Sequence, residues 1–75
     1  MPKLPVISGR EAGRVFERAG WVFARQKGSH RIYTRVGSRI ALSIPDHGEI
    51  DRGLLRALIR DAGLSVDEFV ALIRG

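Results

Sequence analysis

The stretch from residue 21 to residue 44 constrains the fold most, because it contains three short β-type segments and two turn signals. The segments are residues 21–26, 30–35 and 39–44. The turn signals between them are Lys27-Gly28-Ser29 and Val36-Gly37-Ser38. Consecutive strands that are joined by short turns pair antiparallel, so this stretch predicts a three-stranded meander.

The third segment shows the clearest alternation, and Pro45 ends it. One of its faces comprises Ile40, Leu42 and Ile44, and the other comprises Arg39, Ala41 and Ser43. This period of two is typical of a half-buried strand. The pattern therefore predicts a sheet with one apolar face, which needs a cover of helices.

A helix is predicted before the first strand. Ser8 and Glu11 form a Ser-x-x-Glu capping box, which satisfies two backbone N–H groups at the helix start. Gly20 lies where a left-handed C-terminal residue is expected. The apolar stripe of this helix consists of Ala12, Val15, Phe16 and Ala19. Gly13 costs the helix about 1 kcal/mol relative to alanine, which indicates that another group packs closely there.

Two more helices are predicted after the loop Pro45-Asp46-His47-Gly48-Glu49. One begins at about Asp51 and is closed by Gly63, and the other begins at the capping box of Ser65 and Glu68. Their apolar stripes are Leu55, Leu58, Ile59 and Ala62, and then Val66, Phe69, Val70 and Ile73. We therefore expect a single α+β domain over residues 1–75, with helices on one face of the sheet and a short extra helix at the C-terminus.

The charge of the chain is compatible with a nucleic-acid partner. Thirteen Lys and Arg oppose eight Asp and Glu, for a formal charge of +5. Such a surplus fits a polyanionic partner, but it also fits solubility alone. The distribution says more, because five cations occur within fifteen residues without an acidic residue between them. These cations are Arg25, Lys27, Arg31, Arg35 and Arg39.

The sequence Gly28-Ser29-His30 is the main candidate for a catalytic site. Glycine lets the chain turn sharply and approach a ligand closely, and His30 is predicted to open the next strand. An imidazole can take or give a proton near neutral pH. Arg25, Lys27 and Arg31 surround it in sequence, so Gly28, Ser29 and these cations form a candidate phosphate-binding site. The alternative is a histidine that only bonds to a backbone carbonyl.

This set of groups suits the cleavage of RNA. RNA carries its own nucleophile, the 2′-hydroxyl, and a base that removes its proton lets it attack the adjacent phosphorus. Nearby cations stabilise the charge on the phosphoryl oxygens, so neither a metal nor a cofactor is required. The expected products are a 2′,3′-cyclic phosphate and a 5′-hydroxyl.

Other candidates carry less weight. His47 is either the second member of an acid–base pair or an ordinary loop residue, and the general acid stays unassigned. The acids around it match no zinc or calcium spacing. Phe16, Trp21 and Phe23 are expected in the core. Tyr33 alternates with the cations of the second segment, so we expect it on the open face, in contact with RNA or a protein partner.

The location is expected to be cytoplasmic. The chain has no cysteine, which excludes disulfides, Cys-based zinc sites and thiol catalysis. Residues 1–7 lack the apolar core of a signal peptide. No apolar run approaches the roughly 18 residues of a membrane helix, so no membrane partner is expected.

The motifs together resemble the HicA family of toxins. The resemblance runs from about Ser8 to Phe69 and is most specific in the run Gly20-Trp21 to Arg25-Gln26-Lys27-Gly28-Ser29-His30. Three further segments are similar: Ile44-Pro45-x-His47, Gly53-Leu54 and Ala62-Gly63-Leu64-Ser65. The family often has a small residue where this chain has Leu54, and the motif does not account for residues 1–7.

The resemblance implies both a fold and an activity. The fold is α-β-β-β-α, like that of a double-stranded-RNA-binding domain. The activity is that of a ribosome-independent mRNA interferase, an endoribonuclease toxin of a type II toxin–antitoxin system. Its substrate is single-stranded or structured mRNA, its inhibitor is a HicB-like antitoxin, and its catalytic histidine corresponds to His30.

Three alternatives remain open on the sequence. A non-catalytic RNA-binding module would use the same cations without cleavage. A helix-turn-helix DNA reader is suggested by residues 52–74, although the last predicted helix begins with Asp67 and Glu68, which would repel phosphate. The third alternative is a pure protein-interaction module, and a steep dependence of RNA binding on salt would count against it.

Overall fold

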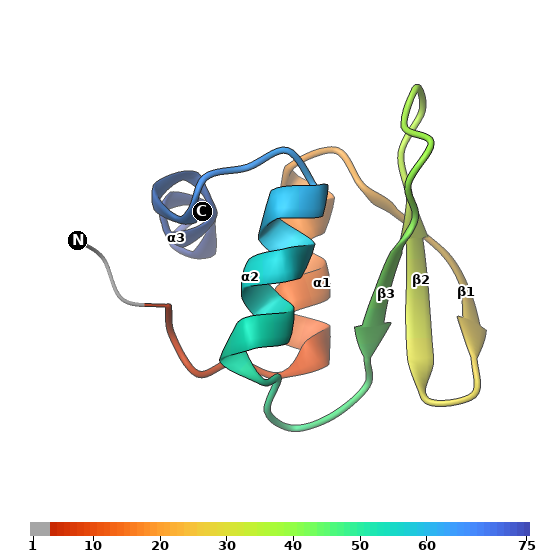
Figure 1. Cartoon of the computed structure of the whole chain (residues 1–75), viewed down its shortest axis with the longest axis horizontal. Helices are drawn as coiled ribbons and strands as arrows, with labels where there is room; N and C mark the ends of the chain where they lie inside the picture. Colours follow the sequence, from red (N-terminus) through yellow and green to blue (C-terminus); the bar gives the residue numbers. More distant parts are fainter. Residues whose placement is uncertain (1–3) are drawn as a thin grey trace.

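The computed structural model describes residues 4–75 and confirms the α+β prediction (Figure 1). The elements in chain order are α1 (Gly9–Arg18), β1 (Val22–Lys27), β2 (His30–Thr34), β3 (Leu42–Pro45), α2 (Arg52–Asp61) and α3 (Val66–Ile73). The three strands form one sheet in the order β1-β2-β3, and both pairs are antiparallel. All helices lie on the same side of this sheet, so its other face is uncovered (Figure 1).

Both predicted capping boxes are present. The Ser8 hydroxyl accepts from the Glu11 N–H at 3.1 Å, and the Glu11 carboxylate accepts from the Ser8 N–H at 3.0 Å. Ser65 and Glu68 form the same pair of bonds at 3.0 and 2.8 Å. Gly20 has a φ of +98°, the left-handed conformation expected after a helix. Local side-chain chemistry therefore fixes where α1 and α3 begin.

The core lies between the sheet and the helices. Its largest fully buried side chains are Phe16, Trp21, Tyr33, Leu42, Ile44, Leu55, Ile59 and Phe69. The residues before α1 also contribute, because Leu4 and Ile7 are buried and the Ile7 carbonyl accepts from the Ile50 N–H at 2.9 Å. The described part of the N-terminal lead, which the family motif leaves unexplained, is thus part of the core.

Contacts with α1 hold the C-terminal helix α3 in place. The ring of Phe69 is fully buried, with its centroid 5.1 Å from that of Phe16. The Arg18 guanidinium donates to the carbonyls of Leu72 and Ile73 at 2.7 and 3.2 Å. A cation at the C-terminus of a helix also complements the helix dipole. Helix α3 is therefore an integral part of this domain.

The third strand begins later than the sequence predicts. The strand starts at Leu42, and Ile40 lies outside it with 48% of its surface exposed. The Ser38 hydroxyl donates to the Ile40 carbonyl at 2.9 Å and accepts from the Ile40 N–H at 3.1 Å. Such local side-chain bonds compete with the sheet for backbone groups. They lengthen the connection between β2 and β3 at the expense of the strand.

The prediction that Tyr33 lies on the open face is wrong. Its side chain is 2% exposed and points to the helices, where its hydroxyl lies over Gly13. Leu42, which is directly opposite on β3, is buried on the same side. Tyr33 therefore has no surface left for RNA or a protein partner. Its position confirms that a group packs closely against Gly13.

We expect Gly13→Ala to lower the free energy of unfolding by about 1–3 kcal/mol, as overpacking of a core does. A Cβ at this position would overlap the Tyr33 hydroxyl, and because the Tyr33 ring is buried, the ring or the helix must shift within the core. The overlap outweighs the gain in helix propensity of about 1 kcal/mol.

A double-mutant cycle in urea tests this contact. Tyr33→Phe removes the oxygen that a Cβ would meet first, so Gly13→Ala should cost less in that background. A Gly13→Ala protein that is more stable than the wild type would contradict the close packing.

Candidate functional site

The hairpin between β1 and β2 places His30 at the start of a strand, as predicted. Lys27 ends β1, Gly28 and Ser29 form the turn, and His30 begins β2. Gly28 has a φ of +59°, whereas Ser29 has a negative φ. A positive φ at the first central residue only is the pattern of a type II′ turn, which selects glycine there. The sequence thus dictates the turn that presents the imidazole.

Strand register brings Arg25, Lys27 and His30 to one face. Lys27 pairs with His30, and Arg25 pairs with Ile32, so these four side chains project from the same side of the sheet. Successive side chains of a strand point to opposite faces. Because Tyr33 points to the helices, the residues on either side of it in β2 point away from the helices. The exposed or half-buried residues that share this open face are Val22, Arg25, Lys27, His30, Ile32, Thr34 and Ser43. Since no acidic residue is among them, the face is cationic.

Arg31 lies on the opposite side of the sheet from His30. Its guanidinium carbon is 4.3 Å from the centroid of the Phe23 ring, and its Nε is 3.4 Å from the Tyr33 hydroxyl. The prediction that Arg31 shares a phosphate site with His30 is therefore not supported by its position. Its guanidinium instead covers the Phe23 ring at the edge of the core in a cation–π contact.

The loop after β3 is tied to the hairpin turn. The Asp46 N–H donates to the Ser29 carbonyl at 2.7 Å, and the Gly9 N–H donates to the His47 carbonyl at 2.9 Å. The backbone of His47 is thereby fixed beside the start of α1, while its side chain is exposed. The end of the molecule that carries His30 thus carries the second histidine as well. Space beside Gly28 is open, so a phosphate can approach the turn closely.

An ion pair that the sequence did not reveal supports this loop. Arg10 donates from Nε and from one terminal nitrogen to the two Asp46 carboxylate oxygens, at 3.1 and 3.3 Å. This hydrogen bonding lowers the pKa of Asp46, and Arg31 and His47 lower it further by their charge. The partners are 36 residues apart, so no local motif could have paired them.

The lowered pKa of Asp46 predicts a loss of stability in acid. Because the folded protein holds fewer protons on this group, its contribution is present above the usual pKa of about 3.9 and disappears as the pH falls through the lowered pKa. Asp46→Asn removes that contribution. We expect the urea midpoint of the variant to fall less steeply than that of the wild type below about pH 4.

Two other carboxylates keep part of the acid dependence in both proteins. The pKa of Glu11 and that of Glu68 are lowered by the backbone N–H groups of Ser8 and Ser65. If the midpoints of the wild type and of Asp46→Asn were parallel from neutral pH to pH 3, the ion pair would not anchor the loop.

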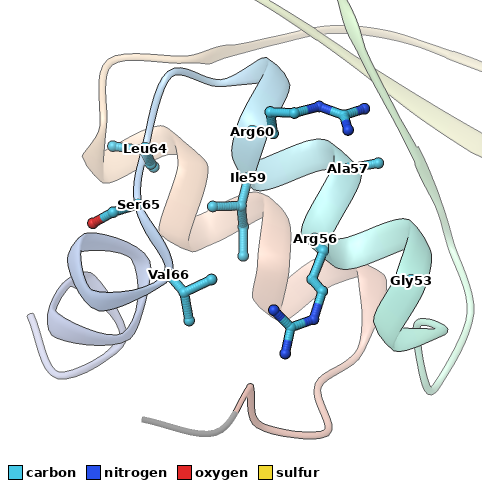
Figure 2. Close-up of a pocket in the computed structure, with 8 residues that line it drawn as sticks. All are labelled: Gly53, Arg56, Ala57, Ile59, Arg60, Leu64, Ser65 and Val66. Carbon is cyan, nitrogen blue, oxygen red and sulfur yellow. The ribbon is translucent and has the colours of Figure 1, made fainter. Parts of the chain in front are cut away.

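A separate hollow of about 470 Å³ lies between α2 and α3 (Figure 2). Its lining consists of Gly53, Arg56, Ala57, Ile59, Arg60, Leu64, Ser65 and Val66. None of the predicted site residues is among them. The side chains of Arg56 and Arg60 point away from one another, so they do not converge on one ligand (Figure 2).

Residues 4–75 contain no cluster of three or more His, Cys, Asp or Glu that could hold a metal ion. No helix in the same range has the length and hydropathy of a membrane span.

Comparisons with known proteins bear on the whole domain. The model of the family described as the HicA toxin of bacterial toxin–antitoxin systems matches residues 9–64, which is more than half of the chain. A chain in a solved structure, described as a toxin–antitoxin complex from Streptococcus pneumoniae, is 30% identical, with a TM-score of 0.70. That match covers 77% of this chain and 98% of the other. No curated protein matches the sequence. On the family match and the structural likeness together, this chain belongs to the HicA family of bacterial toxins.

Proposed function

We propose that this protein is an endoribonuclease that cleaves mRNA without the ribosome, with His30 as its catalytic base. The observation that carries the proposal is the exposed imidazole of His30, opposite Lys27 on a face without acidic residues. Membership of a toxin family supports an activity that harms the cell when it is unrestrained. The same face without the histidine would suit RNA binding alone.

The proposed reaction needs only the groups of the open face and the RNA. The imidazole of His30 takes the proton of a 2′-hydroxyl, and the 2′-oxygen attacks the adjacent phosphorus while the bond to the 5′-oxygen breaks. Lys27, which lies opposite His30, stabilises the charge on the phosphoryl oxygens, and Arg25 binds the RNA backbone beside it. The leaving 5′-oxygen takes a proton from water or from a second acid, for which His47 is the candidate in the described part of the chain.

The end groups of the products test this chemistry. We expect protein at a small fraction of the RNA concentration to cleave a defined transcript, leaving 2′,3′-cyclic phosphate and 5′-hydroxyl ends, with equal rates in the presence and absence of EDTA. Mass spectrometry identifies the ends. Cleavage abolished by EDTA would overturn the metal-free reaction, and binding without turnover would favour an RNA-binding module instead.

We also propose that an antitoxin of the HicB type neutralises the protein by covering His30 and placing acidic residues on the cationic face. The structural relative comes from a toxin–antitoxin complex, which supports a partner of this kind. The open face is free of acids, so an acidic partner surface complements it. A complex in which the antitoxin leaves His30 open to solvent would contradict this mode of inhibition.

A further inference from the structure

The open face continues beyond His30 along the sheet. Strand pairing sets its side chains in rows, and the row that contains His30 also contains Lys27. The next row consists of Arg25 on β1, Ile32 on β2 and Ser43 on β3. It lies two residues along each strand, which is about 6.8 Å from the His30 row. A nucleotide chain whose phosphate lies at His30 would therefore meet this second row with its next unit.

The three side chains of the second row differ in chemistry in a way that fits one nucleotide. Arg25 is exposed and forms no ion pair within residues 4–75, so its guanidinium is available to a phosphate. Ile32 is half-buried in the centre of the sheet and presents an apolar surface. The exposed hydroxyl of Ser43 can donate to or accept from a base edge or a 2′-hydroxyl.

The aromatic side chains of Phe, Trp and Tyr are not positioned to contact a base at this second row. Phe16, Trp21, Tyr33 and Phe69 are buried, and the ring of Phe23 lies under Arg31 on the other side of the sheet. Beside the His30 row, the open face therefore offers a base the aliphatic surface of Ile32 and the plane of the Arg25 guanidinium. Only a base that is not stacked on its neighbours can use them, because the flat sides of bases are covered in a duplex.

We propose that Arg25, Ile32 and Ser43 form a subsite for the nucleotide next to the scissile phosphate, and that this subsite selects single-stranded RNA. The inference rests on the proposed function for the role of His30. The contacts themselves depend on strand register alone. Arg25 binds the phosphate, Ile32 supports the base and Ser43 contacts the base edge.

Binding of a short, fluorescein-labelled RNA with 2′-fluoro groups tests the subsite without cleavage. From fluorescence anisotropy we expect Ile32→Thr to weaken binding about tenfold and Ser43→Ala about fivefold. Arg25→Ala should weaken binding and also reduce the slope of log K against log salt by about one, whereas Ile32→Thr should leave that slope unchanged. Circular dichroism confirms that each variant is folded.

Matched controls lie away from the open face. Arg14→Ala removes an exposed cation from α1, and Val36→Thr makes the same kind of change at a fully exposed loop position. Both should bind as the wild type does. The subsite is overturned if the three variants bind like these controls, or if a duplex of the same sequence binds more tightly than the single strand.

Different results would contradict the proposed subsite and the proposed nuclease activity. If the wild type cleaves unmodified RNA but the three substitutions leave affinity unchanged, the subsite is wrong and the nuclease stands. If the substitutions weaken binding but unmodified RNA stays intact, the surface binds single strands and the proposed nuclease activity is wrong.

Discussion

Replacement of His30 by alanine is expected to slow RNA cleavage by about 10²–10⁴-fold, the contribution that a positioned general base makes. The side chain is exposed at the start of β2, so its loss should change the free energy of unfolding by less than about 0.5 kcal/mol. The measurement is the single-turnover rate on a defined RNA, with the urea midpoint of each protein recorded alongside.

The affinity of the same variant for an uncleavable RNA separates catalysis from binding. His30→Ala should bind 2′-fluoro RNA within about twofold of the wild type, because Lys27 and Arg25 remain on the open face. Cleavage that survives the substitution would remove His30 from its role. An affinity loss as large as the loss of rate would make His30 an RNA ligand instead of a base.

The second large effect is expected in α3, outside the part of the chain that the family model matches. Phe69→Ala should lower the free energy of unfolding by about 3–5 kcal/mol, the usual cost of emptying a buried phenylalanine site. The ring is fully buried against Phe16, and a domain of this size has only about 5–15 kcal/mol in total. Chemical denaturation at neutral pH measures the change.

Val70→Ala on the same helix is the matched control. Val70 is only partly buried, and alanine favours the helix, so the expected loss is well below 1 kcal/mol. If Phe69→Ala were as mild as this control, α3 would be an appendage and residues 9–64 would carry the stability of the domain by themselves.

Local signals predicted the helices well. The capping boxes at Ser8 and Ser65 and the left-handed glycines at positions 20 and 63 depend on residues within one turn of each other. The turn at Gly28 is equally local, which is why the position of His30 at the start of β2 could be predicted. Energies that arise within a few residues are visible in a sequence.

The buried face of β2 could not be predicted, because the positions of the charged residues indicated the wrong face. Arg31 and Tyr33 share the helix-facing side, although an arginine suggests solvent. At the edge of a thin core an arginine can place its guanidinium against the face of an aromatic ring, where a cation–π contact is favourable. The alternation of side chains therefore predicted which residues of β2 share a face, but it did not predict which of the two faces is buried.

The contacts that support the site loop were also invisible in the sequence. Arg10 pairs with Asp46 across 36 residues, and the Ser29 carbonyl accepts from the Asp46 N–H only because β3 ends beside the hairpin turn. Such contacts follow from tertiary packing and carry no local signature. The position of His47 near the His30 end of the molecule is a consequence of these bonds.

A single ribose oxygen gives the most direct test of the account. We would follow cleavage of two RNA strands that differ only by a 2′-deoxy substitution at the nucleotide whose phosphodiester the protein cuts. If the 2′-oxygen is the nucleophile that His30 activates, the all-ribose strand is cut at that bond and the substituted strand stays intact there. Cleavage of the substituted strand at the same bond would contradict the proposed chemistry.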